Sequence, residues 1–315
     1  MVKSEATPAQ VGALLAALAT RGESVEELIG GAEALRDLMV PVKVENRHDV
    51  VDIVGTGGDG SMLFNVSTAA SFVVAACGAR VAKHGNKAVS GASGAADAVQ
   101  ALGGALTLGS SALEHVFARC GFCFMYAPLH HGALKSVAGL RRELKVRTLF
   151  NMLGPLANPA SVGSHLLGVF SPELLEPYAQ ILQRFESRCA CIVHSDDGLD
   201  EFSVAAPSSY VWLDEKGIQT FKLDPREYGM DYTDLSGLKA QTAEESVKLI
   251  LAAFSGENRK ARDTVALNAG VALVVAGVSQ RIDEGIMRAH QAMDDGLAEQ
   301  KAREYARLTQ QAEGA

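Results

Sequence analysis

The chain of 315 residues is poor in positive charge and in cysteine, and each shortage excludes a class of protein. Its 29 lysines and arginines stand against 37 acidic residues, and the net charge of -8 argues against a nucleic-acid or membrane-surface protein, which needs a basic surface. No apolar run approaches the roughly 20 residues of a membrane-spanning helix. The N-terminus also lacks the apolar segment of a signal peptide. We therefore expect a soluble, cytoplasmic protein.

Cysteine occurs at only five positions, which are Cys77, Cys120, Cys123, Cys189 and Cys191. An odd number of cysteines scattered in apolar segments predicts reduced thiols and argues against a disulfide framework. Cys120 and Cys123 have the spacing of a redox pair, but such a pair normally opens a helix. Here the pair spans a predicted helix end and enters an apolar strand, so a redox or zinc role is disfavoured.

Hydrophobic residues make up 48% of the chain, enough for a large packed core, and their pattern changes near residue 50. Before this point they recur at helical spacing, and Thr7-Pro8 and Ser24 with Glu27 mark two helix starts. Beyond it, short buried strands alternate with helices. This alternation predicts an α/β fold with a mostly parallel sheet flanked by helices. The predicted strands are 50–54, 80–83, 122–126, 165–169 and 189–194, and the helices between them include 67–77 and 94–102.

Two segments depart from this alternation. Residues 128–156 are basic and only partly helical, and we expect them to leave the sheet and return toward the N-terminal helices. Residues 210–223 are typical of a β-hairpin around a polar turn. The C-terminal region then returns to helices, one of which is predicted to begin at a capping box of Thr242 and Glu245.

A glycine-rich loop follows the first predicted strand, at residues 55–60. Glycines let consecutive backbone amides converge on one anion, and ligands of parallel sheets bind beyond the carboxyl ends of the strands. The loop lacks the lysine of a P-loop and the glycine spacing of a dinucleotide-binding motif. On this loop alone, a phosphate site and a tight structural turn both stay open.

Two further features at strand ends favour an anion. Residues 65–68, Asn-Val-Ser-Thr, begin a helix, where free amides and the helix dipole attract negative charge, although an ordinary N-cap has the same residues. Lys83 ends the next strand, where it either meets a phosphate or faces solvent. Because three such features fall at successive strand ends, a phosphate site is the better interpretation of the set.

Adjacent carboxylates, Asp200 and Glu201, follow the strand 189–194. Such a pair suits Mg²⁺, which takes oxygen ligands and commonly bridges to substrate phosphates, and an acidic surface turn is the alternative. Arg141, in the basic segment, either pairs bidentately with a substrate carboxylate or lies on an exposed helix face. Spacing does not decide whether His130 and His131 line a ligand site.

These motifs together resemble the anthranilate phosphoribosyltransferase family. The resemblance extends over nearly the whole chain, in the family's order and spacing. The matching segments are Gly-Thr-Gly-Gly-Asp at 55–59, Asn-Val-Ser-Thr at 65–68, Lys-His-Gly-Asn at 83–86, Arg-Thr-Leu-Phe-Asn at 147–151, Leu-Gly-Pro-Leu at 153–156, Asn-Pro at 158–159 and Gly-Leu-Asp-Glu at 198–201. The third and fourth of these distinguish the family from the related pyrimidine nucleoside phosphorylases.

The resemblance implies two domains with the active site between them. Residues 1–47 and 128–150 would form a small helical domain, and residues 48–127 and 151–315 an α/β phosphate-binding domain of the nucleoside phosphorylase/phosphoribosyltransferase type. It also implies an enzyme of tryptophan biosynthesis that uses Mg²⁺. This enzyme would transfer the phosphoribosyl group of phosphoribosyl pyrophosphate to the amine of anthranilate and release pyrophosphate.

By position, the resemblance assigns site residues to each substrate and to the metal. The donor, phosphoribosyl pyrophosphate, would bind to Gly55, Gly58, Asp59, Asn65, Val66, Ser67, Thr68, Lys83, His84, Gly85, Asn86 and Ser90. Anthranilate would meet Gly55, Asn86, His131 and Arg141, and Mg²⁺ would bind to Ser67, Asp200 and Glu201. No general base is assigned, because the weakly basic amine need not be deprotonated before it attacks.

The chain departs from the family pattern around the phosphate site. Leu63 stands where the family usually has a hydroxyl residue, and residues 90–95 read Ser-Gly-Ala-Ser-Gly-Ala in place of Ser-Ser-Lys-Ser-Gly-Ser. Gly91 and Ala95 therefore lack hydroxyl groups. At about 0.5–1.5 kcal/mol per hydrogen bond, losing these contacts would weaken donor binding roughly ten- to a thousandfold. Backbone amides at Gly91 and Ala95 could recover part of that loss.

Three functions stay open at this point. The leading hypothesis is an active anthranilate phosphoribosyltransferase with small-molecule substrates and no nucleic-acid or membrane partner. The alternatives are a transferase or phosphorylase of the same fold with another acceptor, and a non-catalytic paralogue with weakened donor binding. A homodimer is also left open, because the helical region before Thr7 is shorter here than in the family, where it contributes to a dimer interface.

Overall fold

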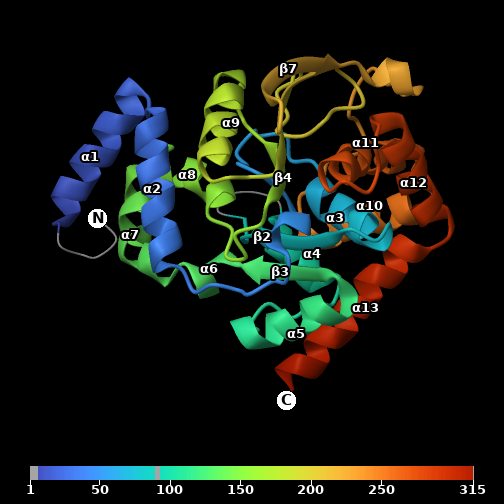
Figure 1. Cartoon of the computed structure of the whole chain (residues 1–315), viewed down its shortest axis with the longest axis horizontal. Coiled ribbons are helices and arrows are strands. Elements are labelled where there is room, and N and C mark those ends of the chain that lie inside the picture. The colour runs from blue at the N-terminus through green and yellow to red at the C-terminus, as the bar shows by residue number, and fades with distance from the viewer. Residues whose placement is uncertain (1–5, 89–92, 315) are drawn as a thin grey trace.

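The computed structural model describes residues 6–88 and 93–314. A seven-stranded sheet runs through the larger part of the molecule, and the N-terminal helices stand together at one side of it (Figure 1). Within the described residues, no helix is long and apolar enough to cross a membrane.

The sheet has the strand order β3-β2-β1-β4-β5-β6-β7. Its parallel strands are β1 (Val50–Gly55), β2 (Arg80–Gly85), β3 (Phe122–Tyr126), β4 (Ser164–Gly168) and β5 (Cys189–Ser195), and the antiparallel pair is β6 (Ser208–Asp214) and β7 (Gly217–Leu223). This arrangement confirms the predicted mostly parallel sheet and the predicted hairpin. The central strand β1 begins with buried residues on both of its faces, as expected of a parallel strand covered by helices.

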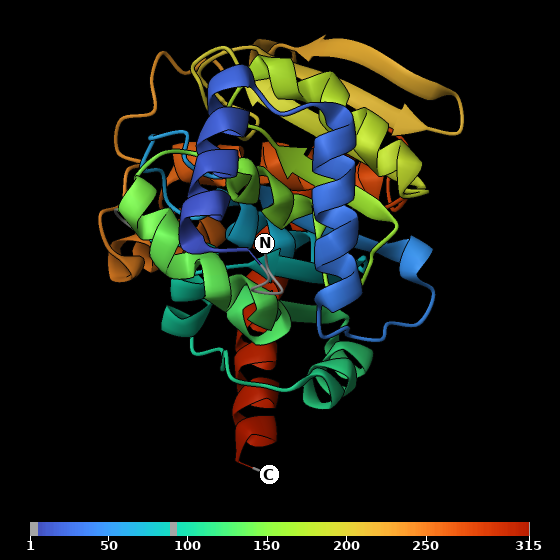
Figure 2. The ribbon, with the colours of Figure 1, turned by 90° about the vertical axis from the view of Figure 1, so that its left-hand side faces the viewer.

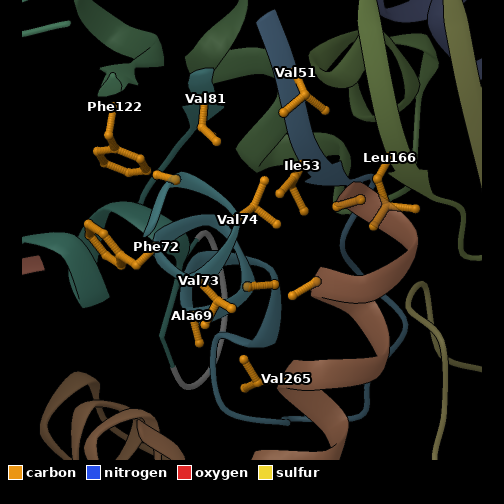
Figure 3. Close-up of a cluster of buried hydrophobic side chains, with 14 of the residues drawn as sticks. Val51, Ile53, Ala69, Phe72, Val73, Val74, Val81, Phe122, Leu166 and Val265 are labelled. Atoms are coloured by element: carbon orange, nitrogen blue, oxygen red, sulfur yellow. The ribbon is translucent and has the colours of Figure 1, made fainter. Parts of the chain in front are cut away.

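Helices cover both faces of the sheet and bury its apolar side chains. On one face, α3 (Val66–Ala76) packs under β1 and β2, and α11 (Arg259–Val275) packs against α3 and β4 (Figure 3). Phe72 of α3 stacks on Phe122 of β3 with 4.5 Å between ring centroids. On the other face, α9 (Leu175–Arg184) packs against β5 and β6.

Six further helices in the described part of the chain pack around these layers. They are α4 (Ala95–Ala101), α5 (Ser110–Cys120), α6 (Ala127–His130), α10 (Ala243–Ser255), α12 (Ile282–Asp294) and α13 (Leu297–Glu313). Short 3₁₀ turns lie at Arg47–Asp49, Gly132–Leu134, Gly154–Leu156, Pro172–Leu174 and Pro225–Tyr228.

A helical group joins segments that lie far apart in the sequence. The helices α1 (Pro8–Arg21) and α2 (Val25–Leu38) both begin at capping boxes, and they pack against α7 (Lys135–Leu144) and α8 (Leu149–Leu153) (Figure 2). Their apolar side chains share one buried cluster with α9, β4 and β5. The segment between β3 and β4 therefore crosses from the sheet to the N-terminal helices and returns.

One predicted local feature is wrong in part. Thr242 caps α10 by accepting a hydrogen bond from the Glu245 amide at 3.2 Å. The reciprocal half of the capping box does not form, because the Glu245 carboxylate accepts instead from the Gln241 amide at 2.7 Å. The helix start is thus as expected, whereas the partner of the acidic side chain lies one residue earlier in the chain.

The cysteines are all free thiols. Cys120 ends α5 and Cys123 lies within β3, and both are buried. Burial raises the pKa of both thiols above the usual range, so neither has the thiolate character of a redox cysteine.

Candidate active site

The segment that carries Asp200 crosses directly over the carboxyl ends of β1 and β4. A β-carbon built on Gly168 would overlap the Asp200 carbonyl oxygen, and it would lie 3.1 Å from the Asp200 α-carbon. One built on Gly55 would overlap the Asp200 carboxylate, with Cγ at 3.0 Å. The two glycines are neighbours in the sheet register, so together they make the shallow seat on which this segment rests.

The two carboxylates of this segment face the amides that the sequence assigns to an anion. The Gly57 amide donates to Asp200 Oδ2 at 2.7 Å, and the Ser67 amide, at the start of α3, donates to Glu201 Oε1 at 3.1 Å. The negative charge at these amides is therefore supplied by the chain itself. A phosphate bound at these amides would lie beside the two carboxylates. Their mutual repulsion would be offset by a cation that bridges the phosphate and the carboxylates.

Charge repulsion and burial act on this acidic pair together. Burial, with the nearby Asp59 carboxylate, raises the pKa of Asp200 to about 6. Burial and the charges of Asp200 and Asp59 raise the pKa of Glu201 well above its ordinary value. Neither carboxylate has an ion-pair partner within 4.0 Å among the described residues. An acidic pair without a direct ion-pair partner favours a bound cation.

A buried cation lies on the other side of Ser67. Lys83, in β2, is only 1% exposed, and its ammonium group donates to Ser67 Oγ at 3.2 Å and to the Ile53 carbonyl. Burial lowers the pKa of Lys83 to about 8, and the charges of Asp52, Glu201 and Asp200 oppose that shift. At neutral pH this lysine therefore keeps its charge and directs it at the start of α3.

A buried polar network holds β2 behind the site. Asp52 accepts a hydrogen bond from the His84 amide at 3.2 Å and one from Asn158 Nδ2 at 2.7 Å. Asn158 Nδ2 also donates to the Ala82 carbonyl at 2.9 Å. Burial raises the pKa of Asp52 to about 6, while Lys83 and these hydrogen bonds favour the charged form. The Asn-Pro motif is thereby tied to the strand that carries Lys83.

Two histidines that lie far apart in the sequence come together. The rings of His84 and His131 are 5.0 Å apart, and both side chains are buried. His84 Nδ1 lies 3.2 Å from the Gly154 carbonyl, which only accepts, so Nδ1 carries the proton. Burial and the neighbouring histidines lower the pKa of His84 to about 3. Its ring is therefore neutral, and Nε2 has no partner among the described residues.

The glycine-rich loop is held by an arginine from the fourth motif. Gly57 and Gly58 have φ values of +66° and +76°, which side-chain-bearing residues rarely adopt. Arg147 donates to the Gly58 carbonyl, and its guanidinium stacks on the Phe170 ring at 3.9 Å from the centroid. The loop conformation thus depends on a residue from the segment that returns from the helical group.

Other residues assigned from the sequence have mixed surroundings. Val66 and Thr68 are buried in the first turn of α3, and the Thr68 hydroxyl has no partner among the described residues. Gly85 ends β2 against the Phe124 ring, and Asn86 begins the loop that follows. Ser90 and Gly91 lie outside the described residues.

Arg141 lies in the last turn of α7 within the helical group. Its guanidinium is 5.5 Å from the Phe150 ring centroid, and burial lowers its pKa. It has no ion pair with a carboxylate in the part of the chain that the structure describes. A partly buried guanidinium without a counter-charge is suited to an incoming carboxylate.

The donor set fits a divalent cation that is completed by substrate. Two carboxylates and the Ser67 hydroxyl offer hard oxygen ligands, as Mg²⁺ prefers. Among the described residues, no three or more histidine, cysteine or acidic side chains form a complete metal cage. Mg²⁺ is commonly held by one or two carboxylates together with substrate phosphates, so an incomplete cage is the expected arrangement for it.

Several residues at the site gave no signal of their own in the sequence. Gly168 is needed only because the Asp200 segment passes over it. Ser246 hydrogen-bonds to Asn65, but in the sequence it is an ordinary helix residue. Arg147 belongs to a quoted motif, but its contact with Gly58 depends on the tertiary fold.

Comparisons with known proteins agree with this geometry. Residues 47–299 match the model of the glycosyl transferase family a/b domain, and residues 1–39 match that of the glycosyl transferase family helical bundle domain. The chain is 46% identical to the anthranilate phosphoribosyltransferase of Teredinibacter turnerae over 98% of this chain and 92% of the relative. It is also 46% identical to that of Chromohalobacter salexigens, over 98% and 90% of the two chains.

Solved structures give the same result. The crystal structure of anthranilate phosphoribosyltransferase from Thermus thermophilus matches with a TM-score of 0.90 and 38% identity, over 98% of this chain and 92% of that one. The Saccharomyces cerevisiae enzyme, in complex with phosphoribosyl pyrophosphate and Mg, matches with a TM-score of 0.89 and 28% identity, over 98% and 90%. On sequence and structure together, this chain belongs to the anthranilate phosphoribosyltransferase family.

Proposed function

We propose that this protein transfers the phosphoribosyl group of phosphoribosyl pyrophosphate to the amine of anthranilate and releases pyrophosphate, a reaction of tryptophan biosynthesis. It is an enzyme of the pentosyl-transferring glycosyltransferases. One observation carries the proposal: Lys83, the start of α3 and the Asp200-Glu201 pair are brought together by hydrogen bonds to Ser67 and to the glycine-rich loop after β1. Family membership supports the same reaction.

The donor half of the site combines amides, hydroxyls and one cation. Lys83 supplies a fixed positive charge, and Ser67 and Thr68 supply hydroxyls at a helix N-terminus. The glycine-rich loop supplies further amides near Asp59. The proposed donor-binding set is the one that the resemblance assigns, namely Gly55, Gly58, Asp59, Asn65, Val66, Ser67, Thr68, Lys83, His84, Gly85, Asn86 and Ser90.

The proposed metal ligands are Asp200, Glu201 and Ser67. When bound, Mg²⁺ would neutralise part of the negative charge that develops on the leaving pyrophosphate. A yeast relative solved with phosphoribosyl pyrophosphate and Mg supports the use of this ion. Hydrogen bonds from the Gly57 and Ser67 amides hold the two carboxylates in place, so the carboxylates need not move when the substrate binds.

The acceptor half is proposed to lie toward the helical group. Arg141 would pair with the carboxylate of anthranilate, and His131, Gly55 and Asn86 would line its ring and amine. The solved structure of the Saccharomyces cerevisiae enzyme in complex with 4-fluoroanthranilate supports an aromatic acceptor of this kind. The domain division inferred from the resemblance, at residues 47/48, 127/128 and 150/151, would place the acceptor where the two domains meet.

Positioning and electrostatics account for the chemistry without a general base. The bond from the ribosyl carbon to pyrophosphate breaks as the anthranilate nitrogen forms its bond to the same carbon, and the amine then loses a proton to solvent. Residues that fix the reactants convert this encounter into an effectively unimolecular step. The neutral ring of His84 agrees with this scheme, because a group with a pKa of about 3 is a weak base.

A fluorescence assay tests the proposed function directly. Adding phosphoribosyl pyrophosphate and Mg²⁺ to the protein and anthranilate is expected to lower anthranilate fluorescence with time, because the substituted amine replaces the free one. Reactions without the donor are the control and should stay constant. Unchanged fluorescence at high protein concentration would contradict the proposal. In that case, base release from thymidine and phosphate would indicate a phosphorylase, and donor binding without turnover a non-catalytic paralogue.

The role of Arg141 is tested by substitution with alanine. A hydrogen-bonded charge pair contributes about 1.5–3 kcal/mol, so Arg141→Ala is expected to raise the KM for anthranilate about 10- to 100-fold. The KM for the donor should change less than about twofold. Arg142→Ala is the matched control, because Arg142 is exposed on the same helix. Equal increases in both KM values would count against the assigned role.

A further inference from the structure

Residues 62–64 form an arm after the glycine-rich loop, and this arm pairs with residues 238–240. The Phe64 amide donates to the Leu238 carbonyl at 2.9 Å, and the Ala240 amide donates to the Met62 carbonyl at 2.9 Å. These bonds form an antiparallel bridge that centres on Leu63 and Lys239. At the position where a hydroxyl is missing, backbone hydrogen bonds thus hold the arm in place.

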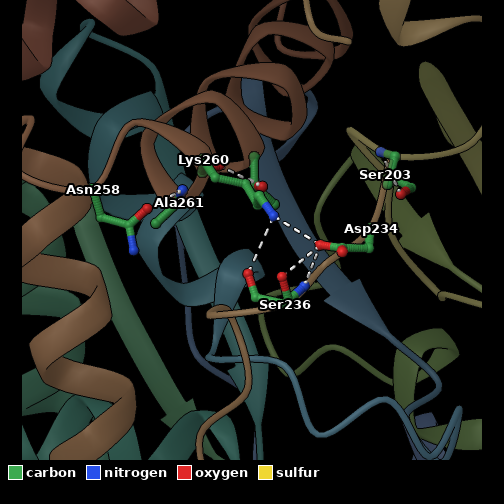
Figure 4. A network of polar contacts seen from close by, with 8 residues as sticks. Ser203, Asp234, Ser236, Asn258, Lys260 and Ala261 are labelled. Atoms are coloured by element: carbon green, nitrogen blue, oxygen red, sulfur yellow. Dashed lines mark hydrogen bonds and ion pairs between the residues drawn. The ribbon is translucent and has the colours of Figure 1, made fainter. Parts of the chain in front are cut away.

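The partner segment is itself anchored to α11. Lys260 of this helix donates to Asp234 Oδ1 at 2.9 Å and to the Ser236 carbonyl at 3.2 Å (Figure 4). The Tyr232 hydroxyl donates to Asp263 Oδ2 at 2.7 Å. The segment 232–240 is therefore fixed to a core helix before it reaches the arm.

Immediately beyond this segment, Ser246 lies in the first turns of α10 and is fully buried. Its hydroxyl accepts a hydrogen bond from the Asn65 amide at 2.9 Å and donates one to Asn65 Oδ1 at 2.7 Å. A hydroxyl can accept and donate at once, so one side chain fixes both the backbone and the side chain of Asn65.

The Asn65 side chain, held by Ser246, also hydrogen-bonds to Ser93 in the loop before α4. Its Oδ1 also accepts from Ser93 Oγ at 2.8 Å, and its Nδ2 donates to the Ser93 carbonyl at 3.0 Å. Asn65 is in addition the N-cap residue of α3, directly before Val66 and Ser67. Its orientation therefore determines where the first amides of α3 and the end of the loop at Ser93 lie.

We propose that Ser246 is a positioning residue for the phosphoribosyl donor, which acts by holding Asn65 against both the start of α3 and the loop at Ser93. The proposal rests on the proposed function, because the donor is the ligand that these elements would bind. Ser246 does not touch the donor in this scheme. Its effect reaches the substrate through Asn65 alone, which distinguishes it from a binding residue.

The test replaces Ser246 with alanine. Two hydrogen bonds are lost and the Asn65 amide is left without its partner, so the KM and the calorimetric Kd for phosphoribosyl pyrophosphate are expected to rise about tenfold. The KM for anthranilate should stay within about twofold. Alanine has the highest helix propensity, so α10 should still form. A rise in neither donor constant, or an equal rise in both KM values, would overturn the proposal.

Two further variants separate positioning from a general loss of packing. Ser279→Ala removes another buried hydroxyl, one without a partner among the described residues, and should leave both KM values unchanged. In an Asn65→Ala background, Ser246→Ala should add less than about twofold, because its route to the donor is already removed. Additive effects would overturn the proposal. If wild-type protein shows no transfer, the proposed function fails, whereas an active wild type with an unaffected Ser246→Ala variant refutes only this inference.

Discussion

Replacing Gly168 with alanine is expected to lower kcat/KM for the transfer reaction about a hundredfold and to destabilise the fold. The added methyl group would occupy the position of the Asp200 carbonyl oxygen. This neighbour is backbone, which cannot move aside by changing a rotamer. The segment that carries Asp200 and Glu201 must therefore lift off the ends of β1 and β4, or the sheet must deform.

Both outcomes carry a measurable cost. Overpacking a core typically costs 1–3 kcal/mol and occasionally more, and here we expect about 3 kcal/mol in the free energy of unfolding. Displacing a catalytic group by about 1 Å can cost on the order of a hundredfold in rate. Denaturant unfolding and steady-state kinetics on the same preparation measure the two effects separately.

Gly30→Ala is the matched control for this substitution. Gly30 lies within α2, and a β-carbon there would meet no atom within 4 Å. Alanine in a helix interior is favoured over glycine by roughly 0.5–1 kcal/mol, so this variant should be unchanged or slightly more stable. If Gly168→Ala kept full activity and stability, the close approach of the Asp200 segment would be refuted.

Gly55 and Gly168 together show what the sequence can and cannot predict. Gly55 stands in a recognisable glycine-rich loop, so a local pattern marks it as a site residue, although not as a seat for the Asp200 carboxylate. Gly168 ends an ordinary buried strand, and its requirement comes from a segment more than 30 residues later in the chain. A local sequence pattern can reveal a requirement that its own residues set. It cannot reveal that a distant backbone segment will pass close to a glycine.

The same distinction applies to the fold. The strands β1 to β5 are predictable because each is a short buried apolar run between turns. The predicted return of residues 128–156 toward the N-terminal helices is confirmed. Which of these helices would pair is not predictable, because their apolar faces could in principle be covered by any other helix. Leu63 predicts a lost hydroxyl, but only the structure gives its backbone partner at Lys239.

For the acidic pair, the sequence predicts the residues but not their surroundings. Adjacent carboxylates after a strand are visible in the sequence at Asp200 and Glu201. That each accepts a hydrogen bond from an amide of a different element, Gly57 and Ser67, follows only from the fold. This environment is what separates a metal site from an acidic surface turn.

Glu201→Gln is expected to lower kcat/KM about 100- to 1000-fold and, at the same time, to stabilise the metal-free protein. Glutamine keeps an oxygen that can accept from the Ser67 amide, so the local geometry is preserved. What it removes is the negative charge that would hold Mg²⁺ against the pyrophosphate. Losing one preorganised electrostatic group of this kind typically costs a factor of 10² to 10³. The Mg²⁺ concentration that gives half-maximal rate should rise as well.

The stability effect has the opposite sign because the charge is costly in the folded protein. Burial and the charges of Asp200 and Asp59 raise the pKa of Glu201 in the folded state, even with Lys83 nearby. A raised folded-state pKa means that this group destabilises the fold increasingly as the pH rises above its unfolded value of about 4.3. Glutamine removes that penalty, so the Tm without metal should increase by about 2 °C or more at neutral pH. The increase should vanish near pH 4.

Glu215→Gln is the control, because Glu215 is exposed in the turn between β6 and β7. The activity and the Tm of this variant should stay close to those of the wild type. Kinetics over a Mg²⁺ titration, with thermal unfolding in a chelator, measure both effects. Full activity of the Glu201→Gln variant would contradict the assignment of Glu201 as a metal ligand. A lower Tm without metal would show that the carboxylate stabilises the fold despite its neighbours. The two expected results together mean that the site keeps a destabilising charge in place, ready for the cation and the pyrophosphate.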